Sequence, residues 1–250
     1  ALGCVAGVTS LAFIVNRDLI LQSNSALSVI IIGGLTVSAI QTMGIFRSLA
    51  MDWFEPLKSI YLLCSLVSFN LDVLRLPCVF PANSATSYII RQFVAPFVAA
   101  LLAVVIWIKS RLGKCAISAM VDYMNTLGTI FSAVFISIAI NIVLPLVCYT
   151  HPDGASSSMQ SHPGVLCWES PGHWAAVGTS MASLAFVLLP FVTIVLWATL
   201  RYKTFVVQAN CGNLASLNAF RFLFFRFHLD RYYYGVLFMM RSLVLCFVPV

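Results

Sequence analysis

Long apolar runs constrain this chain more than any other feature of its sequence. Several of them are long enough, at about 1.5 Å per helical residue, to cross about 30 Å of hydrocarbon. Hydrophobic residues make up 61% of the 250 residues and charged residues only 9%, which is too little charge to cover a water-soluble surface. Because helices satisfy their own backbone groups in lipid, we expect an all-α, polytopic transmembrane helical bundle of about six or seven helices.

The apolar runs also place the expected helices along the chain. The segment 57–76 is interrupted by several polar residues, so it is either a span or a helix lying in the membrane interface. Both ends of the chain lie within apolar runs, and we therefore expect the bundle to be truncated at both ends. The predicted spans are residues 1–15, 25–46, 57–76, 87–109, 124–148, 175–200 and 235–250.

Pro96, Pro145 and Pro190 lie within three of these predicted spans. A proline inside a helix frees one backbone carbonyl and bends the helix, and neighbouring helices can tolerate the bend. We therefore expect local bends at these three positions.

The positions of Lys and Arg predict which loops face the cytoplasm. The segments 109–123 and 201–234 are basic, whereas 149–174 carries no Lys or Arg. Since basic loops stay on the cytoplasmic side, we expect 109–123 and 201–234 there and 149–174 in the extracellular or lumenal space. The net charge of +6 then reflects membrane topology and not nucleic-acid binding. We expect a multi-pass protein of the plasma membrane.

Cys148 and Cys167 bracket the segment 149–174, on the side expected to be oxidising. A disulfide that closes a loop of this size stabilises a fold by roughly 3 kcal/mol in the chain-entropy model. The alternative is two free thiols, and we favour the disulfide. The enclosed segment is rich in His, Pro, Gly and Ser and is typical of an irregular lid with turns.

Three histidines, His151, His162 and His173, lie in or beside this lid. Histidine and cysteine in one loop raise the possibility of zinc binding, but short ligand pairs such as Cys-x-x-Cys are missing. We expect solvated histidines in a polar lid, with no metal and no cofactor.

Arginines alternate with aromatic residues in the segment 219–231. Arginine can reach anionic lipid phosphates from this depth, and aromatic rings favour the headgroup level. We therefore predict an amphipathic helix over 219–231 on the inner leaflet, acting as an anchor or, as a sharper alternative, as a lipid-sensing coupling helix. The predicted lipid-interface residues are Arg221, Arg226, Arg231, Tyr232 and Tyr233, with Tyr234 in the same aromatic belt.

Three further polar residues lie within predicted spans: Arg91, Asn141 and Arg241. A charge at membrane depth costs roughly 3 kcal/mol or more, so it usually faces protein or water. Arg91 is close enough to a span end to reach the interface, whereas Arg241 is harder to explain in this way. We expect the Asn141 side chain to donate an interhelical hydrogen bond.

Catalytic motifs such as His-Glu-x-x-His, Gly-x-Ser-x-Gly and a phosphate-binding loop are missing from the sequence. Voltage-sensor arginine repeats and a potassium-filter motif are missing as well. We therefore expect a protein that is not an enzyme.

Three blocks carry a resemblance to a known group of proteins. They are MDWFEPLKSIYLLCSLVSFNLDVLRLPC at 51–78, LPLVCYTHPDGASSSMQSHPGVLCWES at 144–170 and FRFLFFRFHLDRYYYGVLFMMRSL at 220–243. Together they resemble the multi-pass C-terminal membrane region of very large, largely uncharacterised surface proteins of protists, and more loosely the TRP-like membrane proteins of fungi. The chain departs from the pattern at Phe54, where proline is expected, and at Tyr234, where tryptophan is expected.

The resemblance implies a non-enzymatic membrane domain of a large cell-surface protein, which anchors an extracellular assembly and is channel-like or sensor-like. It also supports pairing of Cys148 with Cys167. The implied partners are membrane lipids, further spans and a large ectodomain of the same polypeptide, and extracellular or membrane proteins. The alternatives are a transporter or channel subunit with a polar path near Arg91, Asn141 and Arg241, or a packing subunit of a larger membrane complex.

Overall fold

The described chain is mostly helical, and its longest helices coincide with predicted spans. Predicted spans 1–15 and 57–76 lie outside the described residues, and the described residues of span 25–46 are helical. The computed structural model describes residues 32–33, 35–36, 39–43, 54, 84–112, 116–151, 156–160, 162–224 and 231–247.

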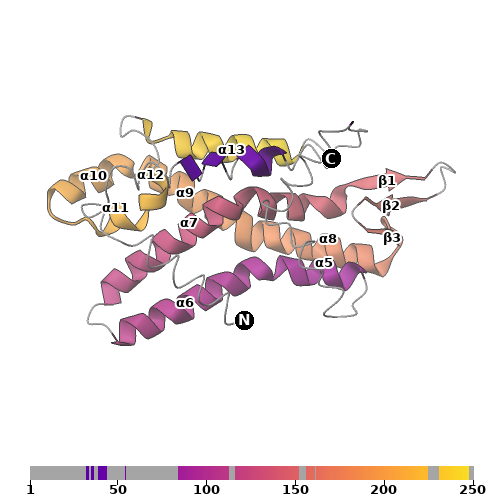
Figure 1. Ribbon diagram of the computed structural model, residues 1–250, viewed down its shortest axis with the longest axis horizontal. Helices are drawn as coiled ribbons and strands as arrows, with labels where there is room; N and C mark the ends of the chain where they lie inside the picture. Colours follow the sequence, from indigo (N-terminus) through magenta and orange to yellow (C-terminus); the bar gives the residue numbers. More distant parts are fainter. Residues whose placement is uncertain are drawn as a thin grey trace. The chain divides into compact units, whose positions relative to one another are not determined.

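Within these described residues, three apolar helical segments are long enough to cross a membrane. They are Tyr88–Ile108, Ala119–Leu146 and Pro171–Leu200, and they overlap predicted spans 87–109, 124–148 and 175–200. The last predicted span, 235–250, contains a shorter apolar helix. The helices concerned are α5 (Ser84–Gln92), α6 (Val94–Leu112), α7 (Ala116–Val143), α8 (Pro171–Ser183), α9 (Leu189–Leu200) and α13 (Tyr234–Cys246) (Figure 1).

The basic connection predicted over 109–123 is much shorter in the structure. Helix α6 continues to Leu112 and α7 already begins at Ala116. Asp122, which the prediction placed in this connection, lies within α7, and its backbone carbonyl accepts a hydrogen bond from the Thr126 hydroxyl at 2.7 Å. The prediction placed the start of the span too late because it treated the polar residues of this connection as a loop.

The described chain divides into two compact units. The first contains residues within Ala1–Leu35, Pro96–Ala133 and Val192–Met239, and the second contains residues within Thr36–Ala95, Val134–Phe191 and Met240–Val250. Each unit is described separately below.

In the second unit, the predicted irregular lid is an antiparallel sheet. Its strands β1 (Cys148–Thr150), β2 (Ser157–Met159) and β3 (His162–Leu166) follow one another in sheet order, with Cys148 opposite Met159 (Figure 1). The prediction of an irregular segment was wrong, because short strands of Ser, His, Pro and Gly lack the apolar alternation by which strands are usually recognised.

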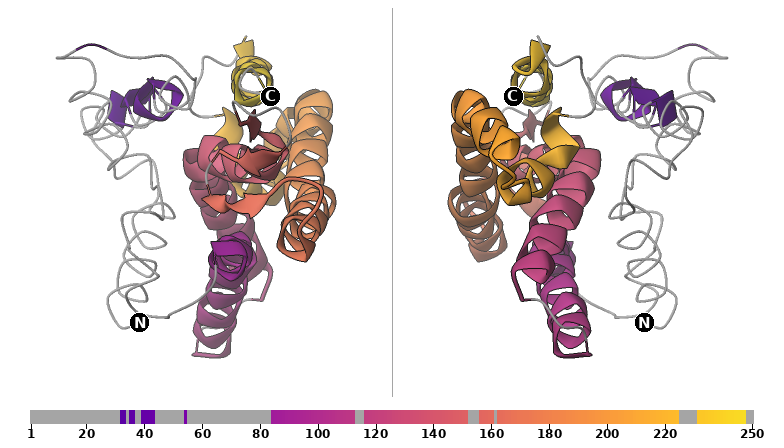
Figure 2. Two further views of the ribbon diagram at one scale, coloured as in Figure 1. Left: turned by 90° about the vertical axis from the view of Figure 1, so that its right-hand side faces the viewer. Right: turned by 90° about the vertical axis from the view of Figure 1, so that its left-hand side faces the viewer.

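The first unit contains three short helices: α10 (Tyr202–Asn210), α11 (Ala215–Ala219) and α12 (Arg221–Phe224) (Figure 2). The amphipathic helix predicted over 219–231 is interrupted at Phe220, and residues 225–230 of that segment lie outside the described residues. Phe220 forms the interruption, because its buried ring stacks on the Phe205 ring of α10, with the two ring centroids 5.8 Å apart. These aromatic side chains pack against protein and turn the chain between α11 and α12.

Each of the three span prolines marks a local departure from α-helical geometry. Before Pro96 the chain makes a turn at Phe93 between α5 and α6, and Pro145 lies in the 3-10 turn η3 (Leu144–Leu146). Pro190 follows the π-helical turn η4 (Leu184–Leu188). Since proline lacks an N–H donor, tighter or wider turns allow the neighbouring carbonyls to find other partners.

Close packing of α12 on α7 gives the first testable prediction. A Cβ atom at Gly128 of α7 would overlap the Phe222 ring of α12. We predict that Gly128→Ala lowers the free energy of unfolding by about 1–3 kcal/mol, because the ring or the short helix must move. Reversible unfolding of the chain in detergent micelles measures this change.

Gly178→Ala is the matched control. Gly178 also lies within a helix, α8, but a Cβ atom there would meet nothing within 4 Å. The control change should be neutral or should stabilise the chain by about 0.5–1 kcal/mol, as alanine does in helices. Equal destabilisation by both changes would contradict the close contact at Gly128.

Candidate functional site

The C-terminal end of α7 organises the second unit. Pro145 has no N–H group, so the Asn141 carbonyl four residues earlier loses its usual intrahelical donor. The chain then tightens into η3, where the Val147 N–H group donates to the Leu144 carbonyl at 3.2 Å. Several carbonyls at this helix end therefore need donors from elsewhere.

Helix α5 supplies two donors to the Asn141 carbonyl. The Tyr88 hydroxyl donates to it at 2.7 Å, and the Gln92 amide nitrogen Nε2 donates to it at 3.0 Å. Gln92 Nε2 also lies 2.6 Å from the Tyr88 hydroxyl. Tyr88 is 1% exposed and Gln92 9%, so both side chains are removed from solvent. Their hydrogen bonds join α5 to the proline-terminated end of α7.

Helix α8 supplies donors to the next carbonyls. The Ser180 hydroxyl donates to the Ile142 carbonyl, and the His173 ring nitrogen Nε2 lies 3.0 Å from the Pro145 carbonyl. Both side chains are completely buried. The end of α7 is therefore capped from both sides, by α5 and by α8.

These hydrogen bonds determine the tautomer of His173. The Trp168 N–H group donates to Nδ1 at 3.1 Å, so Nδ1 must be an acceptor. The Pro145 carbonyl can only accept, so Nε2 must carry the hydrogen. His173 is thus held as the neutral Nε2–H tautomer. The prediction of a solvated His173 is wrong, because the side chain is fully buried among these partners.

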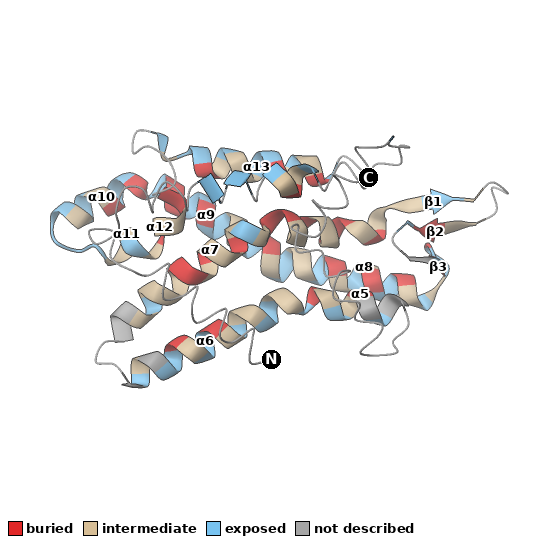
Figure 3. Ribbon diagram, viewed as in Figure 1, coloured by how far each residue is buried: buried red, intermediate tan, exposed pale blue. Residues whose placement is uncertain are grey.

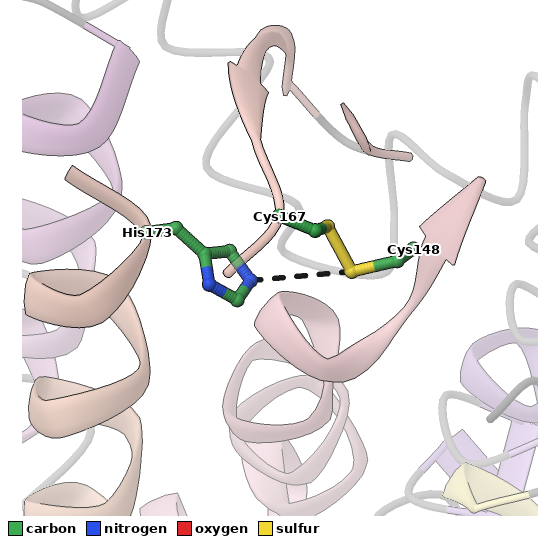
Figure 4. A group of neighbouring side chains, drawn as sticks. All are labelled: Cys148, Cys167 and His173. Carbon is green, nitrogen blue, oxygen red and sulfur yellow. Dashed lines mark hydrogen bonds between the residues drawn. A yellow bond between two sulfur atoms is a disulfide. The ribbon is translucent and has the colours of Figure 1, made fainter. Parts of the chain in front are cut away.

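A disulfide links Cys148 at the start of β1 to Cys167 just after β3, as the sequence predicted. The Cα atoms are 6.4 Å apart, and Cys148 Sγ lies 4.0 Å from His173 Nε2 (Figure 4). The three residues have the composition of a metal cluster. A disulfide provides no thiolate ligands, however, and both ring nitrogens of His173 are already used. The arrangement fits a structural lock better than a zinc site.

The start of α8 is fixed by the residues that follow Cys167. Ser170 is the N-cap, with its hydroxyl oxygen 3.2 Å from the His173 N–H group, and Pro171 occupies the first helical turn. The same hydroxyl donates to the Leu166 carbonyl at 2.9 Å. Serine at the N-cap and proline next are a typical helix start, and here they carry His173 to the end of α7.

Trp168 connects the disulfide to α8. Its φ angle is +66°, and it alone among the described non-glycine residues has a positive φ. The Trp174 indole N–H donates to the Trp168 carbonyl at 3.1 Å, and the two rings are 5.5 Å apart with an interplanar angle of 71°. A non-glycine residue in this backbone region is strained and persists only where its surroundings hold it in place. Contacts with His173 and Trp174 hold Trp168 here.

The three polar residues of predicted spans have different surroundings. The Asn141 side chain donates within its own helix, to the Ser137 carbonyl at 2.9 Å, so its predicted interhelical donation is wrong. Its backbone carbonyl makes the interhelical contacts instead. Arg91 of α5 is partly buried and Arg241 of α13 is exposed.

The predicted lipid-interface residues lie in the first unit, except Arg226, which lies outside the described residues. Arg231 is exposed and donates to the Tyr233 hydroxyl at 2.9 Å, and this hydrogen bond raises the pKa of the guanidinium. Tyr232 stacks on Tyr202 with centroids 4.6 Å apart. Arg221 is partly buried on α12. Of the tyrosine belt, Tyr233 and Tyr234 are the exposed members.

Comparison of the chain with known protein families, with characterised proteins and with solved structures found no match.

Sequence reasoning identified the disulfide but missed the side chains that cap α7. The spacing of Asn141 and Pro145 signals an unpaired carbonyl, but Tyr88, Gln92 and Ser180 are distant in sequence and resemble ordinary polar residues of a span. Trp168 gives no signal either, because its unusual φ angle arises from the turn between the disulfide and α8.

Capping of α7 gives the second prediction. Tyr88→Phe should lower the free energy of unfolding by about 1 kcal/mol, because Gln92 still serves the Asn141 carbonyl. Tyr88→Phe combined with Gln92→Leu should cost more than the sum of the single changes, since the buried carbonyl then has no donor. Reversible unfolding in detergent micelles measures all three variants.

Two variants serve as controls for this prediction. Tyr149→Phe removes a hydroxyl from an exposed tyrosine on β1 and should change stability by less than about 0.5 kcal/mol. Pro145→Ala restores a backbone N–H four residues after Asn141, so Tyr88→Phe should cost less in that background. An equal cost in both backgrounds would contradict the role assigned to Pro145.

Proposed function

We propose that this chain is a non-enzymatic, multi-pass membrane domain that holds the disulfide-closed sheet β1–β3 outside the cytosol. One observation carries the proposal: the disulfide lies between two apolar helices of membrane length, Ala119–Leu146 and Pro171–Leu200. Disulfides persist in oxidising compartments. A sheet closed in this way between two spans suits the extracellular or lumenal side.

Large apolar side chains exposed on the long helices support this proposal. Phe97 and Trp107 of α6 are 66% and 59% exposed, and Phe186 and Leu200 of the third long helix are 81% and 77% exposed. Figure 3 marks exposed positions along α6. Large apolar side chains exposed along membrane-length helices are typical of contact with lipid or with another protein. In the proposed orientation these side chains contact acyl chains.

The charge distribution supports the same orientation. Arg111, Arg201 and Lys203 are exposed near the ends of long helices, whereas 149–174 has no Lys or Arg. The Arg111 guanidinium also lies 5.2 Å from the Trp107 ring centroid, and paired basic and aromatic residues are typical of the membrane interface. The basic loops are then cytoplasmic, and Arg231 with Tyr233 forms part of an inner-leaflet anchor.

In the full proposal, residues 1–76 and 235–250 contribute further spans to a bundle of about six or seven helices. The domain anchors a large ectodomain of the same polypeptide at the plasma membrane, as the resemblance to protist surface proteins implies. Its partners are membrane lipids and extracellular or membrane proteins. In this proposal the domain also has a channel-like or sensor-like role beside anchoring.

The transport alternative has less support from the structure. It requires a polar path near Arg91, Asn141 and Arg241, but the Asn141 carbonyl already accepts two hydrogen bonds and its amide donates within α7. The polar groups around Asn141 therefore serve helix packing.

Glycosylation mapping tests the proposed orientation. The sequence contains no Asn-x-Ser/Thr motif. Gly154→Asn creates one over 154–156 between β1 and β2, and Ala215→Thr creates one over 213–215. In membranes with active oligosaccharyl transferase, we predict that only the first variant gains an endoglycosidase-sensitive glycan.

Each variant is the control for the other, because both carry a single new motif in the same chain. A glycan on the second variant alone would show that the orientation is inverted. Release of the unmodified chain by alkaline carbonate would show that it does not span the membrane.

A further inference from the structure

The two indoles of Trp168 and Trp174 form an exposed corner beside the disulfide. Their rings meet at 71° with centroids 5.5 Å apart, and the side chains are 50% and 56% exposed. The Trp174 indole N–H is already donated to the Trp168 carbonyl. The corner therefore offers two aromatic faces at a wide angle, and aromatic faces attract cations.

The corner is held rigidly by buried groups behind it. The Trp168 N–H group donates to His173 Nδ1, and the Trp168 ring packs edge-on against the His173 ring at 4.9 Å. The disulfide fixes the preceding residue, Cys167. These contacts keep Trp168 at a positive φ angle, and strain retained in this way often accompanies a binding function. A buried tryptophan would be simple packing, but half of this side chain is left exposed.

The charge of the segment around this corner indicates which kind of ligand it binds. The segment 149–174 contains Asp153 and Glu169 and no Lys or Arg. Glu169 is exposed and directly follows Trp168. A surface of this charge repels anionic headgroups and favours a cation. Quaternary ammonium groups are bound by aromatic faces in this way, because they cannot donate hydrogen bonds and their charge is spread over methyl groups.

The position of Trp174 at the start of α8 indicates that the ligand belongs to a membrane lipid. Trp174 lies in the first helical turn of Pro171–Leu200, an apolar helix of 30 residues. In the orientation proposed above, on which this step rests, the start of that helix lies at the level of the lipid headgroups. We propose that Trp168 and Trp174 bind the choline headgroup of membrane lipids, with Glu169 supplying the complementary charge, and so hold the sheet β1–β3 against the outer leaflet.

Saturation-transfer NMR of the full chain in maltoside micelles, which contain no choline, tests the corner directly. The probes are phosphocholine and phosphoethanolamine. We expect saturation of the phosphocholine N-methyl protons and about ten-fold weaker binding of phosphoethanolamine, whose ammonium prefers water. Trp168→Leu and Trp174→Leu should each remove most of the phosphocholine signal.

Trp107→Leu is the matched control, because Trp107 is 59% exposed but lies on α6. This variant should bind phosphocholine like the wild type. Trp174→Phe retains an aromatic face and should keep part of the binding. Far-UV circular dichroism and the unfolding midpoint show whether each variant is folded like the wild type, and an unfolded variant is replaced by its phenylalanine counterpart.

Equal signals for the two headgroups, or binding that survives the loss of both indoles, would overturn the proposal. Tighter binding of a trimethyl-lysine peptide than of phosphocholine would overturn the lipid assignment in favour of a protein partner. The micelle measurement does not depend on membrane orientation. A correctly glycosylated chain that does not bind phosphocholine therefore refutes this inference alone, whereas an inverted chain refutes the proposed function.

Discussion

Pro145 creates the constraint on which the second unit depends. It removes the donor that the Asn141 carbonyl would otherwise have, and side chains packed around this end of α7 supply donors in its place. The fold satisfies the exposed carbonyls with side chains of two other helices: Tyr88 and Gln92 reach Asn141, and Ser180 reaches Ile142. Because an unsatisfied buried carbonyl costs about 1–3 kcal/mol, the capped end of α7 determines how α5 and α8 pack against it.

The sheet and its disulfide depend on the same helix end. His173 joins them, because one ring nitrogen reaches the Pro145 carbonyl while the other accepts from Trp168. The neutral tautomer satisfies both contacts at once. The turn that brings Cys167 to Cys148 is thus continuous with the capping of α7. The exposed indoles at this turn are positioned by the buried Trp168–His173 hydrogen bond together with the Trp174–Trp168 hydrogen bond and ring contact.

Local patterns predicted the long helices well. Apolar length identified three membrane-length segments, and Ser170 followed by Pro171 explains where α8 begins. The positions of Cys148 and Cys167 at the two ends of one loop, on the side expected to be oxidising, favoured the disulfide over two free thiols, and the structure confirms the pair. The short strands could not be predicted, since register and hydrogen bonds hold them in place without an apolar alternation. The turn at Phe220, within the helix predicted over 219–231, could not be predicted because it accompanies the stacking of Phe220 on Phe205, which is distant in sequence.

The capping side chains were beyond prediction for a different reason. An unpaired carbonyl can be inferred from a proline four residues later, but its partner is chosen by tertiary packing. Tyr88 lies 53 residues before Asn141, and no local signal connects the two. The interhelical hydrogen bond was predicted for the polar side chain of Asn141, whereas the backbone carbonyl of Asn141 accepts the interhelical hydrogen bonds.

Isotope-edited infrared spectroscopy tests this central claim most directly. A ¹³C=¹⁸O label on the Asn141 carbonyl reports how many donors that single group accepts, and a label on Val134 within α7 serves as reference. The account predicts a lower amide I frequency for Asn141 in the wild type than in the variant combining Tyr88→Phe and Gln92→Leu, with the Val134 band unchanged. An Asn141 band that is the same in both proteins would contradict it.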